Sequence, residues 1–160
     1  MKNSAYHSSL MFRMNERLFV NALDGVSEEQ AQERISGHNN PLIWIAAHTV
    51  WARYNAAALL GQPVTNPYKD RFGKDNPYNP ADTQPSLSEV KQEWKKASEL
   101  LLQALEDVSE DHLSSTSPLP SPIGEMSTGG TLAFFAQHES YDIGQMAFLK
   151  KYHTERAMAY

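Results

Sequence analysis

The sequence contains no cysteine, which excludes a disulfide framework, a thiolate metal site and a thiol nucleophile carried by the protein itself. Any sulfur chemistry would therefore need an external thiol. Long hydrophobic runs are also missing, because the longest apolar stretch, PLIWIAAHTVWA, is short and is interrupted by His48. Neither this stretch nor the polar segment MKNSAYHSSL predicts a membrane span or a signal peptide, so we expect a cytoplasmic protein.

Clusters of basic residues are scarce, and the formal net charge is −5. The two lysine pairs, at 95–96 and 150–151, lie among acidic residues or at a predicted helix end. This pattern is typical of solvated helix faces, so we expect no nucleic-acid partner. With 160 residues, of which 41% are hydrophobic, the chain is long enough to bury one core. We therefore predict a single domain over residues 1–160.

The hydrophobic pattern predicts four long helices and no strands. The first spans about residues 6–23, and the second starts at Asn40-Pro41 and ends before Gly61. Ser88 is the predicted cap of the third helix, which reaches about residue 105. The fourth follows the Gly129-Gly130 pair and ends near Tyr152. A short helical turn capped by Ser27 is also predicted.

Residues 61–86 separate the second and third helices and hold five of the nine prolines. Such a composition predicts a long crossover loop, and long loops inside small domains tend to serve function. Four helices without strands predict an all-α protein, specifically a four-helix bundle. Metal and ligand sites in bundles are built from side chains that face inward from opposing helices.

The fourth helix carries a charged residue on its most apolar side. Phe135, His138, Asp142, Met146 and Leu149 share this side at a rotation of 100° per residue. A buried carboxylate needs a partner, since unpaired burial costs on the order of several kcal/mol. Taken alone, the His138–Asp142 spacing is more typical of a buried ion pair or of a hydrogen-bonded core histidine than of a metal site.

The second helix offers a partner. Trp44, His48, Trp51, Ala52, Asn55 and Leu59 share one side of it, whereas Ala46, Thr49, Arg53 and Ala57 share the other. We predict that His48 points into the bundle. Together with His138 and Asp142, it would supply two nitrogens and one oxygen to a divalent cation. Three protein ligands leave coordination positions open, which is characteristic of catalytic metal sites.

Two stretches of the sequence are familiar. NNPLIWIAAHTVWARYNAAALLG and, some ninety residues on, TLAFFAQHESYDIGQMAFLKK resemble the DinB-like superfamily of four-helix-bundle metalloproteins, also described as YfiT-like. The resemblance implies a metal, usually zinc or nickel, on one histidine of the second helix and an H-x-x-x-H pair of the fourth. His48 and His138 match two of these positions, and Gly144-Gln145 matches the glycine-glutamine pair that follows.

Asp142 occupies the position at which the resemblance implies the third histidine. Its shorter side chain would place the metal closer to the fourth helix or require a bridging water. One hypothesis is a working site with two histidines and one carboxylate, a ligand set that also suits iron or manganese. The other is a degenerate pocket that binds metal weakly. We favour the working site, because the buried carboxylate still needs a cation or a proton.

The resemblance implies thiol-dependent transferases among other activities. We hypothesise a metal-dependent transferase or hydrolase that activates water or a low-molecular-weight thiol towards a small electrophilic substrate. Glu139 and Tyr141 are candidates for proton transfer. The candidates for substrate contact are Trp44, Trp51, Asn55 and Gln145. The loop 61–86 would cover the pocket and select the substrate.

The alternative hypothesis is a non-catalytic bundle that binds a small molecule or dimerises and retains a degenerate metal site. Apolar and aromatic residues surround most of the fourth helix, including Phe134, Tyr141 and Phe148 near its outer edge. Such a helix suits helix-on-helix packing between two copies, so we expect a homodimer.

Overall fold

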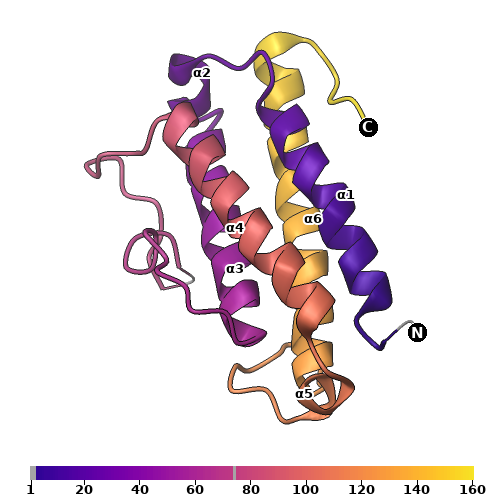
Figure 1. Ribbon diagram of the computed structural model, residues 1–160. Coiled ribbons are helices and arrows are strands. Elements are labelled where there is room, and N and C mark those ends of the chain that lie inside the picture. The colour runs from indigo at the N-terminus through magenta and orange to yellow at the C-terminus, as the bar shows by residue number, and fades with distance from the viewer. Residues whose placement is uncertain (1–2, 74) are drawn as a thin grey trace.

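A computed structural model describes residues 3–73 and 75–160, and Figure 1 shows their arrangement. All regular elements in these ranges are helices, apart from one isolated bridge between Thr116 and Ser127. The helices are α1 (Tyr6–Leu23), α2 (Glu28–Gln32), α3 (Leu42–Leu59), α4 (Leu87–Asp107), α5 (Glu110–Ser114) and α6 (Thr128–Thr154). The all-α prediction is confirmed; positions 1, 2 and 74 of the predicted domain and loop lie outside the described residues.

The four long helices form the bundle. α3 packs against both α4 and α6, and α1 packs against the other sides of α6 and α4. In Figure 1, α1 and α6 run in one direction while α3 and α4 run in the opposite one. This order places the middle of α3 beside the middle of α6, where His48 and His138 lie.

Serine side chains begin four of the helices in the described part of the chain. Ser27, Ser86, Ser109 and Ser127 each accept a hydrogen bond from a backbone N–H in the first turn of their helix. Each bond satisfies a donor that has no partner inside the helix. The short α2 capped by Ser27 is therefore present as predicted.

The starts of α4 and α6 differ from the sequence prediction. The cap of α4 is Ser86 rather than Ser88, because Ser86 forms a reciprocal capping box with Glu89. α6 starts at Thr128 and includes both glycines of the Gly129-Gly130 pair, since the Ser127 cap precedes them. The short helix α5 was not predicted.

The segment between α3 and α4 contains turns and no helix in its described residues. It returns along the side of the bundle in Figure 1. Tyr68 and Phe72 anchor it, as both are buried and their rings meet edge to face with centroids 5.0 Å apart. The backbone at Gly73 lies so close to the indole of Trp51 that an added Cβ would be 3.3 Å from it. This part of the segment therefore packs directly on α3.

A buried ion pair joins α3 to α6 in the core. Arg53 donates to both carboxylate oxygens of Glu139 at 2.8 and 2.9 Å, and neither side chain is exposed. The guanidinium also donates to Ser98 and to the Phe12 carbonyl, and it lies 3.8 Å from the ring centroid of Trp94. All four long helices thus contribute to one polar network, which fixes the rotation of α6 against α3.

No helix among residues 3–73 and 75–160 has the length and apolar character needed to cross a bilayer.

Candidate metal centre

The middle of α3 holds the imidazole of His48 between two indole rings. Trp44 stacks on it with centroids 5.1 Å apart and an interplanar angle of 8°, and Trp51 stacks on it at 5.2 Å and 19°. One tryptophan precedes the histidine by four residues and the other follows it by three, so helical spacing produces this stack. The ring is therefore fixed in orientation by its own helix.

α6 supplies the facing pair of side chains. Its His138 and Asp142 are one helical turn apart, with Nε2 and Oδ2 separated by 3.7 Å. Phe134 stacks on the His138 ring with centroids 5.6 Å apart. Asp142 is 4% exposed, whereas the His138 side chain keeps 24% of its surface open to solvent. The pair thus combines a buried carboxylate with an imidazole that solvent reaches.

The three side chains meet around one point. The Nε2 atoms of His48 and His138 lie 3.4 Å apart, and one ligand atom from each of His48, His138 and Asp142 lies within 4.8 Å of the others. Zinc binds imidazole and carboxylate at about 2.0–2.2 Å, so tetrahedral ligands are about 3.3–3.6 Å apart. The 3.4 Å between the two imidazole nitrogens and the 3.7 Å between His138 Nε2 and Asp142 Oδ2 are close to the spacing around a single divalent ion.

The hydrogen bonds of the imidazoles also fit a metal. His48 Nδ1 is bonded to the carbonyl oxygen of Phe72, which requires the proton on Nδ1 and leaves the Nε2 lone pair directed at His138. His138 Nδ1 is buried and has no hydrogen-bond partner among the described residues. If His138 carries its proton on Nδ1, the Nε2 lone pairs of His48 and His138 face each other. If the proton is on Nε2, the buried Nδ1 is an acceptor without a donor. A cation between the rings removes the lone-pair clash of the first arrangement and leaves the buried His138 Nδ1–H without an acceptor among the described residues.

Asp142 receives only long hydrogen bonds from its neighbours. Thr49 Oγ1 and Gln145 Nε2 each lie 3.4 Å from one of its oxygens, and Thr49 is closer to the Ile45 carbonyl, at 2.8 Å. In the described residues its only ion-pair partner is His138. Burial raises the pKa of Asp142 to about 7; the Glu139 carboxylate adds to this rise, and the bond to Thr49 opposes it. Without a cation, this carboxylate is poorly stabilised.

Both imidazoles favour the form that binds metal. Burial lowers the pKa of His138 to about 4, with a further contribution from His48. Burial also lowers the pKa of His48, although its bond to the Phe72 carbonyl acts in the opposite direction. The two rings are therefore neutral near pH 7, and neutral imidazole is the ligand form.

Both sides of α3 contain buried residues, whereas the sequence pattern predicts one inward side. Thr49 and Arg53, which share the side opposite His48, are fully buried, whereas Trp44, His48 and Trp51 are partly exposed. α3 has neighbours on most of its circumference, because α4, α6 and the segment around Phe72 all contact it. His48 consequently faces a rim between α3, α6 and that segment.

The two candidates for proton transfer lie in opposite environments. Glu139 is fully buried, and both of its oxygens accept hydrogen bonds from Arg53. Tyr141 is 62% exposed at the surface of α6. Glu139 is therefore committed to the core network, which leaves Tyr141 as the candidate of this pair that can meet a dissolved molecule.

The four candidates for substrate contact occupy distinct positions. Trp44 and Trp51 cover the two faces of His48. Asn55 accepts a hydrogen bond from Asn66 at 3.4 Å and so lies against the segment that follows α3. Gln145 contacts Asp142. The structure thus places Trp44, Trp51 and Gln145 in direct contact with a predicted metal ligand and Asn55 further along α3.

Sequence reasoning missed Phe72 and Arg53. Phe72 acts through its backbone carbonyl, which has no signature in the sequence. Arg53 did carry a signal, because a charged residue inside the apolar stretch WIAAHTVWARYNAAAL requires the same explanation as Asp142.

Comparison with known proteins agrees with this fold. The sequence profile of the DinB superfamily matches residues 11–146. A crystal structure of a conserved protein from Enterococcus faecalis is similar, with a TM-score of 0.74 and 13% sequence identity, over 98% of this chain and 100% of that one. At this identity the likeness shows the fold alone. No curated protein matches the sequence.

Proposed function

The chain belongs to the DinB superfamily, and from this premise we propose that His48, His138 and Asp142 bind one divalent metal ion. The observation that carries the proposal is the convergence of their three ligand atoms within 4.8 Å. The bond from His48 to Phe72 supports it, since it leaves Nε2 available as a ligand. The resemblance implies zinc or nickel, while the ligand set of two histidines and one carboxylate also suits iron or manganese.

We further propose that the protein is a metal-dependent transferase or hydrolase acting on a small electrophilic substrate. A bound divalent cation would supply the acidity that makes water or a low-molecular-weight thiol nucleophilic near neutral pH. The stacked indoles hold His48 in place, and Thr49 and Gln145 orient Asp142. The exposed part of the His138 ring provides the approach from solvent.

Metal analysis tests this proposal. Protein purified without an affinity tag or chelator should be analysed for metal content and then titrated with zinc, nickel, manganese and iron(II). We expect one ion per chain for at least one of these metals, and loss of uptake in His48→Ala with the helical circular dichroism retained. Failure to take up any of the four metals would overturn the proposal.

The second candidate function is a non-catalytic module that dimerises through α6. Its support is an exposed aromatic stripe, because Tyr141, Phe148 and Tyr152 are 62%, 65% and 55% exposed. Phe134, which we had assigned to the same stripe, is half-buried against His138 and Phe135 instead. Under this proposal a homodimer forms, and Phe148→Glu should shift the mass measured by light scattering towards the monomer.

One variant distinguishes the two candidate functions. In a metal enzyme, His48→Ala removes metal and activity while the dimer remains. In a structural module, the same change lowers the free energy of unfolding and leaves both self-association and any bound small molecule unaffected. A cytoplasmic location and the absence of a nucleic-acid partner remain part of the proposal, on the basis of composition and the net charge of −5.

A further inference from the structure

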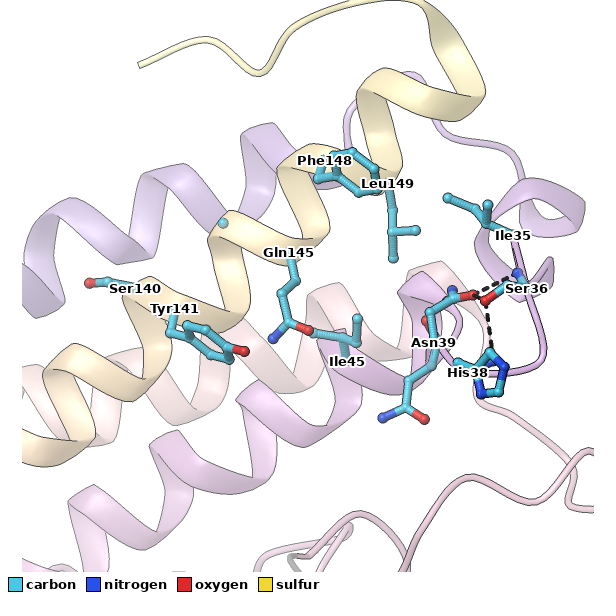
Figure 2. A pocket seen from close by; sticks show the side chains of 12 residues that line it. Ile35, Ser36, His38, Asn39, Ile45, Ser140, Tyr141, Gln145, Phe148 and Leu149 are labelled. Atoms are coloured by element: carbon cyan, nitrogen blue, oxygen red, sulfur yellow. Dashed lines mark hydrogen bonds between the residues drawn. The ribbon is translucent and has the colours of Figure 1, made fainter. Parts of the chain in front are cut away.

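A cleft of about 710 Å³ lies between the second half of α6, the start of α3 and the segment 35–40 (Figure 2). Its wall includes Ile45, three residues before His48, and Gln145, three residues after Asp142. The cleft therefore begins one helical turn from the predicted metal ligands. Its volume falls in the range of small-molecule sites, about 300–1,000 Å³.

The chemical character of the cleft is polar but uncharged. None of the described residues that line it is Asp, Glu, Lys or Arg. Apolar side chains such as Ile35, Ile45 and Leu149 alternate with the hydroxyl and amide groups of Ser36 and Gln145. An ammonium ligand would lose hydration here without gaining an opposite charge from the wall, and a carboxylate would meet His38 alone as a possible cation. An amide or hydroxyl finds matching partners.

The rim opposite α6 is held in a fixed shape by its own hydrogen bonds. Arg34 donates to the carbonyl oxygens of Gly37 and Asn39, and the Asn39 carboxamide oxygen accepts from the Ser36 backbone at 2.8 Å. Figure 2 shows Ser36 and Asn39 joined by the dashed bonds on this side. A wall that is already ordered loses little entropy when a ligand binds.

Across the cleft, Figure 2 shows Tyr141 and Gln145 projecting from α6 towards α3. The amide nitrogen of Gln145 lies 3.4 Å from Asp142 Oδ1, and its carbonyl oxygen has no donor among the described residues. That oxygen is therefore free to accept from a ligand while the nitrogen faces the metal ligand. Gln145 links the cleft to the proposed metal centre.

Gly144 forms part of the cleft lining and has no structural explanation elsewhere. It lies inside the 27-residue helix α6, and a glycine inside a helix stabilises it less than an alanine does. A Cβ at this position would meet no atom within 4 Å, whereas a Cβ at Gly130 would displace the side chain of Glu125. Packing thus gives no reason for a glycine at position 144. The absence of a side chain at Gly144 lowers the surface of α6 at the cleft.

We propose that this cleft binds the uncharged, amide- or hydroxyl-bearing part of a small substrate against the bare backbone at Gly144, next to the metal centre. Gln145 accepts a hydrogen bond from that part, and Ile45 and Leu149 contact its apolar portion. This assignment rests on the proposed function, since the adjoining metal would act on the remainder of the same molecule.

The test uses three probes of equal size and different charge: benzamide, benzoate and benzylamine. Their binding to the zinc-titrated and the untreated full-length chain is measured by saturation-transfer NMR titration. Gly144→Met fills the cleft, and Gln137→Met, at an exposed α6 position outside the cleft, is the matched control. We expect benzamide to bind at least about tenfold more tightly than either charged probe. Gly144→Met should weaken benzamide at least about tenfold, and Gln137→Met should leave it unchanged.

The assignment is overturned if benzamide binds equally to wild type and Gly144→Met. It is also overturned if benzamide does not bind at all, or if the three probes bind equally. Should Gly144→Met fail to fold, Gly144→Ala replaces it, with a higher melting temperature and weaker benzamide binding expected. Zinc uptake is measured in the same samples. If the protein takes up zinc but substitution of Gly144 does not change benzamide binding, only the assignment of the cleft is refuted. If the substitution weakens benzamide binding but no metal is taken up, the cleft is supported and the proposed function is refuted.

Discussion

The Nε2 atoms of His48 and His138 lie 3.4 Å apart, although the two residues are 90 positions apart in the sequence. Each ring is stacked against an aromatic side chain of its own helix, so neither is free to turn away. Two imidazoles directed at one point, with the Asp142 carboxylate beside them, form a preorganised set of donor atoms.

Replacement of His48 by alanine should abolish tight metal binding while the bundle stays folded. The variant loses one of three ligands, and the metal affinity should fall at least about a hundredfold. Isothermal titration with zinc measures the affinity, and circular dichroism reports the fold. His7→Ala, at an exposed histidine of α1, is the matched control and should bind zinc like the wild type.

The Asp142→Asn variant tests the effect of the charge of this residue on zinc binding at nearly constant side-chain size. The carboxamide is nearly isosteric but neutral, so zinc should bind at least about tenfold more weakly. The metal-free variant should nevertheless be more stable than metal-free wild type at pH 8, because an uncompensated buried charge is removed. Urea unfolding in the presence of a chelator measures this difference, and equal or lower stability of the variant contradicts it.

The metal-free protein should lose the stabilising contribution of protonated Asp142 as the pH rises. The folded-state pKa of this group, about 7, lies above its ordinary value of 3.8. A raised folded pKa gives a contribution that is complete below pH 3.8 and disappears as the pH rises through 7. Relative to Asp142→Asn, the wild type should lose on the order of 4 kcal/mol between these limits. The histidines other than His138, which contacts Asp142, contribute equally to both proteins. A stability difference that is flat with pH would contradict the assigned environment.

The Arg53–Glu139 pair should be far more important for stability than a surface pair. Arg53→Ala leaves a buried carboxylate without its partner, and the free energy of unfolding should fall by about 3–5 kcal/mol. Arg13 and Glu106 form a matched surface pair at 3.0 Å, with side chains 48% and 61% exposed. Arg13→Ala should cost less than about 1 kcal/mol. Denaturant unfolding of both variants checks the contrast, and similar losses would contradict the role given to burial.

Arg53→Ala combined with Glu139→Leu should recover part of the stability lost in Arg53→Ala. The double variant contains no unpaired ion in the core, although Asn15 and Ser98 lose partners. The double-mutant cycle, measured by the same unfolding assay, gives the coupling energy. A double variant less stable than Arg53→Ala alone would contradict the expectation.

Much of this fold could be predicted from the sequence because local signals agree with the packing. The Gly61 terminator and the Ser27 cap lie where the pattern places them, and the amphipathic α4 has an ordinary periodicity. α6 was harder to delimit, since apolar residues cover most of its circumference and its start depends on the Ser127 cap. α5 is a single turn without periodicity, so it left no pattern to find.

The predicted metal ligands could be picked out of the sequence because each is a polar side chain within an apolar stretch of its helix. The same signal existed for Arg53 and Glu139, but two charges on different helices can be paired only when the contact between those helices is known. The carbonyl of Phe72 was beyond reach, as every residue has one. The cleft at Gly144 depends on how segment 35–40 folds against α6.

The indoles stacked on both faces of His48 have a practical consequence. Tryptophan emission is sensitive to charge and to paramagnetic ions within a few ångströms, and Trp44 and Trp51 lie at that range from the proposed ligand. Occupancy of the centre should therefore be visible as a change in intrinsic fluorescence, with quenching by nickel stronger than by zinc. Metal binding could therefore be followed in real time by tryptophan fluorescence, without an added dye or label.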